Sequence, residues 1–119
     1  IMAFIKKPIS LKPKMSSIIP TGLSVAFSKD YEIQIRPRSG LAAKNNISIL
    51  NTPGTIDSDY RGEIKVIMYN HGKNEFIVNN GDRIAQMILT PVLKMVLEET
   101  NSDLPETIRG EGGFGSTGK

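Results

Sequence analysis

The chain has 119 residues, of which 39% are hydrophobic and 23% are charged. This length fits one domain with a hydrophobic core and is too short for two ordinary domains. The net charge is +3 and the basic residues are spread along the chain, which favours an anionic small molecule over nucleic acid as the partner. There is no cysteine, so disulfides, thiolate metal sites and a cysteine nucleophile are all excluded.

No apolar run reaches the roughly 20 residues needed to cross a bilayer. The start, IMAFIKKPISL, places its apolar residues before its lysines, which is the reverse of a signal peptide. We therefore expect a soluble protein of a reducing, cytoplasmic compartment, without membrane contact. Because the first residue is Ile1 rather than methionine, we also expect the natural sequence to begin further upstream.

Short strands dominate the expected secondary structure. Alternation with a period of two marks YEIQIR (31–36) as a half-buried strand, and in EIKVIMY (63–69) it sets Ile64, Val66 and Met68 against Lys65, Ile67 and Tyr69. Other short apolar runs bounded by turn residues are GLSVAF (22–27), SIL (48–50), FIV (76–78) and AQMIL (85–89). The best helical candidate, SGLAAKN (39–45), spans one or two turns. The pattern predicts an all-β sandwich or barrel.

The character of the chain changes after Leu97. Residues 98–119 contain few large apolar side chains, several acids and then a run of glycines. Such a composition is typical of an extended arm rather than a core strand. We therefore place a β-domain at residues 1–97 and a glycine-rich C-terminal arm at residues 98–119.

The last eleven residues, RGEGGFGSTGK (109–119), contain two overlapping nucleotide fingerprints. Gly110-x-Gly112-x-x-Gly115 matches the dinucleotide pattern, and the glycines up to Lys119 match most of a P-loop. Both motifs require a helix after the glycines, with its N-terminus at the phosphate. The sequence supplies no residues for that helix, so both interpretations are rejected.

Two segments offer groups for a phosphorylated ligand. In RPRSGL (36–41), Arg38, Ser39 and Gly40 combine a guanidinium, a hydroxyl and backbone amides at the start of the expected helix. The alternative is a strand-ending turn with a capping serine. In GDRIAQMIL, Gln86 lies among apolar neighbours and either completes a buried polar network or faces a ligand.

The segment NTPGTIDSDYRGE (51–63) has the groups needed for hydrolysis. Asp57 can act as general base for an attacking water, and Gly54 lets a flat ligand approach the backbone. The alternative is an ordinary acidic turn.

In the arm, Arg109 can bind a terminal phosphate bidentately and Phe114 can stack on a base. The alternative there is a disordered end. We assign no role to His71, the single histidine.

Taken in order, these segments closely resemble the motifs of the trimeric deoxyuridine triphosphatases (dUTPases). PRSGL resembles the second family motif, NTPGTIDSDYRGE the third, GDRIAQMI the fourth and RGEGGFGSTG the fifth, and IIPTGL is also typical of the family. The first motif is not intact: Ile1-Met2-Ala3 resembles its last three residues, so its aspartate would precede Ile1. The resemblance covers essentially the whole chain.

The resemblance implies a jelly-roll β-sandwich that forms a homotrimer with shared active sites, the arm closing over one of them. It implies that dUTP is hydrolysed to dUMP and pyrophosphate with Mg²⁺, which limits uracil in DNA and supplies dUMP for thymidylate synthesis. The metal would be held by the triphosphate and by waters, with no direct protein ligand.

The resemblance also implies roles for individual residues. Asp57 is the catalytic base, assisted by Ser39. The phosphates would be bound by Arg38, Ser39, Gly40, Gln86, Arg109, Gly115, Ser116 and Thr117. The base and sugar would be bound by Asn51, Gly54, Ile56, Asp57, Tyr60 and Phe114, with Tyr60 leaving no space for a ribose 2′-hydroxyl.

Selection of uracil is expected to come from backbone groups of the 51–60 hairpin, with Asn51, Pro53 and Gly54 leaving no room for a thymine methyl. Rejection through unpaired polar groups reaches on the order of 10⁴-fold, whereas a methyl group is worth about 10 to 200-fold. We therefore expect discrimination against cytosine to be tighter than pocket size alone would give.

Two other functions compete with this one. A dCTP deaminase-like enzyme would have the same fold but needs an acid placed for attack on cytosine. A non-catalytic dUTPase-like regulatory protein would keep the nucleotide pocket as a switch. The intact Asp57 argues against the second, and the incomplete first motif argues mildly for it.

Overall fold

The computed structural model of the protein describes residues 1–113, and residues 114–119 lie outside the described part. Within the described part the chain forms short strands and one short helix. Their order is β1 (Ile9–Leu11), β2 (Ser16–Pro20), β3 (Tyr31–Arg36), α1 (Ser39–Asn45), β4 (Ile47–Ile49), β5 (Gly54–Ile56), β6 (Lys65–Asn70), β7 (Phe76–Val78) and β8 (Gln86–Pro91). The predicted all-β class with a single short helix is confirmed.

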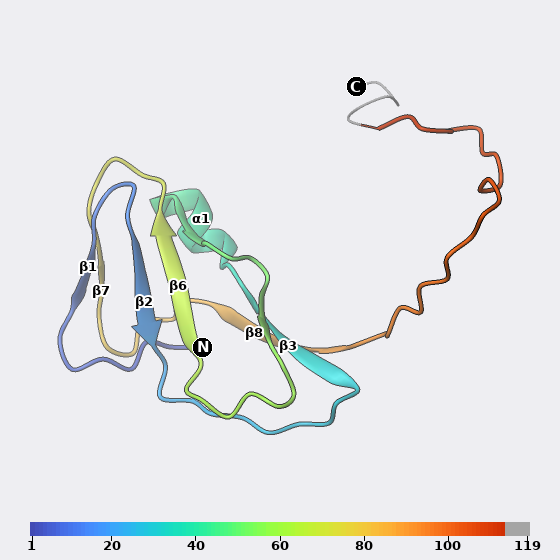
Figure 1. Ribbon diagram of the computed structural model, residues 1–119. Helices are drawn as coiled ribbons and strands as arrows, with labels where there is room; N and C mark the ends of the chain where they lie inside the picture. The colour runs from blue at the N-terminus through green and yellow to red at the C-terminus, as the bar shows by residue number, and fades with distance from the viewer. Residues whose placement is uncertain (114–119) are drawn as a thin grey trace.

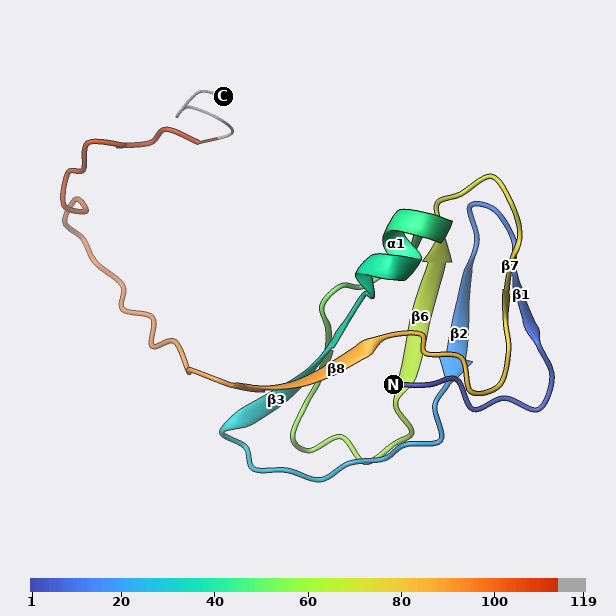
Figure 2. The same ribbon diagram turned by 180° about the vertical axis from the view of Figure 1, so that it is seen from behind.

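The strands form three small antiparallel sheets, in the orders β1-β7, β2-β6-β4 and β5-β3-β8. Figures 1 and 2 show β1 and β7 beside β2 and β6, with β3 and β8 on the other side of the domain and α1 next to the end of β6. Most strands that are neighbours in these sheets are not consecutive in the sequence, as is typical of a β-sandwich whose connections cross from one sheet to another.

The hydrophobic core lies between the inward faces of the sheets. The alternation predicted for residues 31–36 and 63–69 is confirmed, because Ile33 and Ile35 of β3 and Val66 and Met68 of β6 are all buried. Tyr31, at the open start of β3, remains 40% exposed. Alternate side chains of a strand point to opposite faces, so the same pattern leaves polar and mixed side chains outside.

The strand expected at GLSVAF (22–27) does not form. The pairing of β2 with β6 ends at Pro20 and Lys65, and beyond it a single backbone bond links Ile64 N–H to Leu23 O, at 2.8 Å. Val25 and Phe27 still pack against the core. A short apolar run can reflect contact with the core as well as a strand, which is why this prediction was wrong.

The C-terminal segment leaves the domain after β8. Val92 N–H donates to Asp30 O at 2.8 Å, and the next residue, Leu93, is 93% exposed. The chain then runs away from the sheets as an extended arm (Figures 1 and 2). No helix among residues 1–113 is long and apolar enough to span a membrane.

Candidate active site

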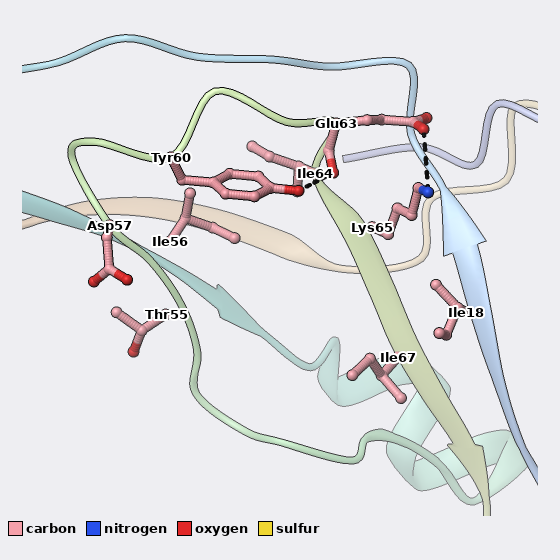
Figure 3. Close-up of a pocket in the computed structure, with 9 residues that line it drawn as sticks. All are labelled: Ile18, Thr55, Ile56, Asp57, Tyr60, Glu63, Ile64, Lys65 and Ile67. Carbon is pink, nitrogen blue, oxygen red and sulfur yellow. Dashed lines mark hydrogen bonds and ion pairs between the residues drawn. The ribbon is translucent and has the colours of Figure 1, made fainter.

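A hollow of about 310 Å³ lies beside the loop of residues 57–64, which joins β5 to β6 and contains the end of the predicted hairpin. Figure 3 shows Tyr60 and Asp57 on one side of it and the apolar side chains of β2 and β6 on the other. Its lining residues are Ile18, Thr55, Ile56, Asp57, Tyr60, Glu63, Ile64, Lys65 and Ile67. Three residues predicted for the base and sugar, Ile56, Asp57 and Tyr60, are therefore brought together.

Backbone and side-chain hydrogen bonds give the hairpin its shape. Tyr60 N–H donates to Asp57 O at 3.1 Å, which closes the turn, and Arg61 donates to Ser58 O at 2.7 Å. The Tyr60 hydroxyl donates to Glu63 O at 2.9 Å (Figure 3). The Asp57 carboxylate accepts no hydrogen bond from the described residues, so its oxygens face solvent and are available to a ligand or water.

The far end of the hairpin is fastened to residues 21–23. The buried Thr21 hydroxyl donates to Ile64 O at 2.6 Å, and Gly22 N–H donates to the Glu63 carboxylate at 2.9 Å. Lys65 lies 3.9 Å from the same carboxylate. The sequence analysis gave Thr21 and Glu63 no role. Thr21 lies in the IIPTGL segment, which is typical of the family, and Glu63 is the last residue of NTPGTIDSDYRGE.

Gly54 and Asn51 lie together at the start of β5. Gly54 is buried and pairs with Ile35 of β3. A Cβ at Gly54 would lie 3.3 Å from the Asn51 amide nitrogen and 3.3 Å from the Ile35 Cβ. Glycine thus lets the Asn51 side chain pack directly against the strand, at the position where the sequence predicted close approach to a flat ligand.

A second group of predicted residues gathers where β3 ends and β8 begins. Arg38 Nη1 donates to Arg83 O at 2.7 Å, and Gln86 Nε2 donates to Pro37 O at 3.0 Å. Gln86 is exposed, so the buried-network alternative for it is wrong. Arg38 also borders a hollow of about 380 Å³ lined by Arg38, Leu41, Phe76, Ile77, Asp82, Arg83 and Ile84.

Ser39 and Gly40 begin α1 beside this second group. Arg38 is the N-cap, and no side-chain hydrogen bond caps the helix, so the capping-serine alternative is wrong. The first amides of a helix have no partner inside it, and both residues are exposed, which leaves these donors open to an anion. A Cβ at Gly40 would meet no atom within 4 Å.

The start of the chain lies against this second group. The Ile1 nitrogen donates to Ala85 O at 2.7 Å, and Ile84 N–H donates to Ile1 O at 3.0 Å. Residues 1–3, which resemble the end of the first family motif, therefore lie next to the segment that resembles the fourth.

Within one chain the two groups of residues do not meet. Ile56 pairs with Ile33, and Gln86 pairs with Arg36, so the groups attach to β3 three residues apart, or about 10 Å. Asp57 and Arg38 continue from these points in opposite directions along β3. The carboxylate predicted as base and the guanidinium predicted for the phosphates therefore lie towards opposite ends of β3.

The remaining predicted residues lie in the arm. Arg109 is exposed, and its Nε donates to Gly112 O at 2.7 Å within the arm itself. Phe114, Gly115, Ser116 and Thr117 lie outside the described residues. Residues 1–113 contain no cluster of three or more histidine, cysteine, aspartate or glutamate side chains that could hold a metal ion.

The chain is similar to known dUTPases in sequence and in fold. Residues 4–118 match the family dUTPase. A deoxyuridine 5′-triphosphate nucleotidohydrolase of Maricaulis maris is 56% identical over 94% of this chain and 73% of its own length.

Two solved structures have the same fold. One is a mutant dUTPase of Staphylococcus bacteriophage 80alpha with dUpNHpp, with a TM-score of 0.81, 23% identity, and coverage of 99% of this chain and 85% of that one. The other is a mutant dUTPase of phage phi11 of S. aureus, which shows the coordination of a structural Mg(II) ion. It has a TM-score of 0.75, 20% identity, and coverage of 86% of this chain and 82% of that one. The predicted jelly-roll sandwich is thereby confirmed, and the match of residues 4–118 together with 56% identity to a named relative shows that this chain belongs to the dUTPase family.

Proposed function

We infer that this protein is a dUTP diphosphatase, which hydrolyses dUTP to dUMP and pyrophosphate. The observation that carries the proposal is the hollow beside β5, where an exposed carboxylate and a tyrosine ring face apolar walls from β2 and β6. Such a hollow suits a nucleoside, and the carboxylate at its rim suits activation of water. By this reaction the protein would limit uracil incorporation into DNA and supply dUMP for thymidylate synthesis.

In the proposed mechanism, the Asp57 carboxylate takes the proton of a water that attacks the α-phosphorus. The exposure of its oxygens supports this role, since a base must be within hydrogen-bond reach of its water. Asn51, Gly54 and Ile56 would bind uracil along the start of the hairpin, with backbone groups pairing with the base. The Tyr60 ring would lie under the sugar and exclude a 2′-hydroxyl.

The triphosphate would be bound by the second group of residues and by the arm. Arg38, Ser39, Gly40 and Gln86 would supply charged and neutral donors, and Ser39 would help to orient the reacting phosphate. From the arm, Arg109 and residues 115–117 would add further donors, and Phe114 would stack on the base. The arm from residue 98 would thus act as a lid over a domain that ends near residue 97.

The residues present fit a metal that arrives with the substrate. No acidic cluster is found among residues 1–113, and the second group is cationic, which suits phosphate oxygens rather than a bare cation. When bound, Mg²⁺ would neutralise part of the triphosphate charge and so favour attack by water. It would be held by the triphosphate and by waters.

We propose that the active sites form between chains of a homotrimer. Two observations support this. The Asp57 group and the Arg38 group lie towards opposite ends of β3 in one chain, which suits a site in which each chain supplies one type of group to a nucleotide. The segment between β8 and the arm also exposes Leu93, Met95 and Leu97 almost completely, and a run of such apolar side chains is normally covered. The absence of cysteine is consistent with a cytoplasmic site of action.

One assay separates the proposed function from its competitors. The protein is incubated with dUTP, dCTP or dTTP in the presence of Mg²⁺, and pyrophosphate and ammonia are measured. Pyrophosphate from dUTP alone is the expected result. Ammonia from dCTP would instead identify a deaminase, and neither product from the folded protein would identify a non-catalytic regulator.

A further inference from the structure

We propose that Gly62 is a positioning residue that sets the orientation of the Tyr60 ring, and through it the preference for deoxyribose over ribose. The proposal rests on the proposed function, in which Tyr60 lies under the sugar. Nothing in the sequence singled out Gly62, which follows Tyr60 by two residues in the hairpin.

The first observation is steric. A Cβ at Gly62 would lie 2.5 Å from the Tyr60 hydroxyl oxygen, 2.7 Å from Cζ and 3.0 Å from Cε2. Carbon atoms attract optimally at about 3.5 to 4.0 Å, so these separations are repulsive. The phenol end of Tyr60 therefore occupies space that any residue other than glycine would fill with its own side chain.

The second observation is the hydrogen bond that this close approach permits. The Tyr60 hydroxyl donates to Glu63 O at 2.9 Å, and the bond spans Gly62 (Figure 3). Tyr60 is 43% exposed, so packing alone does not hold its ring. The contact with the backbone on the far side of Gly62 is what fixes the ring beside the hollow.

The third observation is that the acceptor is itself fixed. The Glu63 carboxylate accepts from Gly22 N–H, and Ile64 is bound on both sides by Thr21 and Leu23. Residues 63 and 64 are thus held to the domain by three hydrogen bonds. Through its bond to Glu63 O, the Tyr60 ring is therefore anchored to a segment that is itself held to the domain, although the hairpin that carries the ring is exposed.

A side chain at position 62 would displace the phenol end and break its bond to Glu63. The ring would then no longer fill the space that a 2′-hydroxyl needs. We expect Gly62→Ala to lower the ratio of kcat/KM for dUTP to that for UTP by about 10-fold or more, the range of a single pocket contact. A purely structural loss would lower both values and leave their ratio unchanged.

The test is a double-mutant cycle with Gly62→Ala, Tyr60→Ala and the two combined. Tyr60→Ala removes the atoms with which the new methyl group collides. The proposal predicts that Gly62→Ala lowers the dUTP to UTP ratio when Tyr60 is present and changes it less than about 2-fold in the Tyr60→Ala background. An unchanged ratio in the single variant, or an equal fall in both backgrounds, would overturn it.

Calorimetry measures the affinity of the same four proteins for dUMP and UMP, and this measurement requires no turnover. Absence of turnover in the wild-type protein would defeat the proposed function alone, because the binding ratios would still report on Gly62. Circular dichroism of each variant checks folding. If Gly62→Ala acted only by unfolding the hairpin, the values for both nucleotides would fall together and their ratio would stay unchanged, which counts against the proposal.

Discussion

Asp57 and Asp59 are two exposed carboxylates in the same hairpin, yet only Asp57 lines the hollow. We expect Asp57→Asn to keep dUTP binding nearly intact and to lower turnover by about 10²- to 10⁴-fold, the usual contribution of a positioned base. Pyrophosphate release and calorimetry measure the two effects separately. Asp59→Asn is the matched control and should keep turnover within about 2-fold. Wild-type turnover in Asp57→Asn would exclude Asp57 as the base.

Asn70 is completely buried at the end of β6. Its amide donates to Leu11 O at 2.9 Å and Asn74 O at 2.8 Å, and it accepts from Gly72 N–H at 2.8 Å. Asn70→Ala leaves these backbone groups unpaired and should cost about 2 to 4 kcal/mol in the free energy of unfolding.

Urea unfolding at fixed protein concentration measures this cost. Asn74→Ala, an exposed asparagine in the same turn, should change the free energy by less than about 0.5 kcal/mol. If the two variants were equally stable, the buried amide would not be what holds the 71–75 turn to β1.

At the scale of elements, the arm and the domain are expected to be separable. The described arm residues beyond 97 bond only within the arm, so truncation after Leu97 should change the free energy of unfolding by less than about 0.5 kcal/mol. Turnover should fall at least about 10-fold because the proposed lid is lost. Phe114→Ala should have a smaller effect in the same direction. A large loss of stability in either ligand-free variant would contradict an arm that is separable from the domain.

At the scale of the whole molecule, the proposed homotrimer with shared active sites predicts that inactive variants complement each other. Asp57→Asn and Arg38→Ala are each expected to be inactive as homotrimers. When they are refolded together, some sites combine an intact Asp57 from one chain with an intact Arg38 from another. Random assembly should restore about a quarter of the wild-type activity.

Mixing without refolding is the control, because subunits that do not exchange should remain inactive. No recovery after co-refolding, with mixed trimers verified by mass, would place both residues of each site in a single chain. The separation of the two groups along β3 would then need another explanation.

Local pattern was sufficient where a segment's structure depends on its own residues. The alternation in 31–36 and 63–69 predicted β3 and β6, and SGLAAKN predicted the bounds of α1. It was insufficient at GLSVAF, where apolar residues contact the core without a pairing strand. A strand forms only where a second strand lies close enough to pair with it, and the local sequence pattern does not show whether such a strand is present.

The sequence by itself determined the class of fold, the single short helix, the motifs of the family and the identity of the groups that can carry out the chemistry. Only the tertiary structure decided how these groups are distributed. It placed Asp57 and Tyr60 at one hollow and Arg38 and Gln86 at the other end of β3, and it brought Gly62 under the Tyr60 hydroxyl. Strand register and the space left by a missing side chain arise from contacts between distant segments, which is why a motif read along the chain does not contain them.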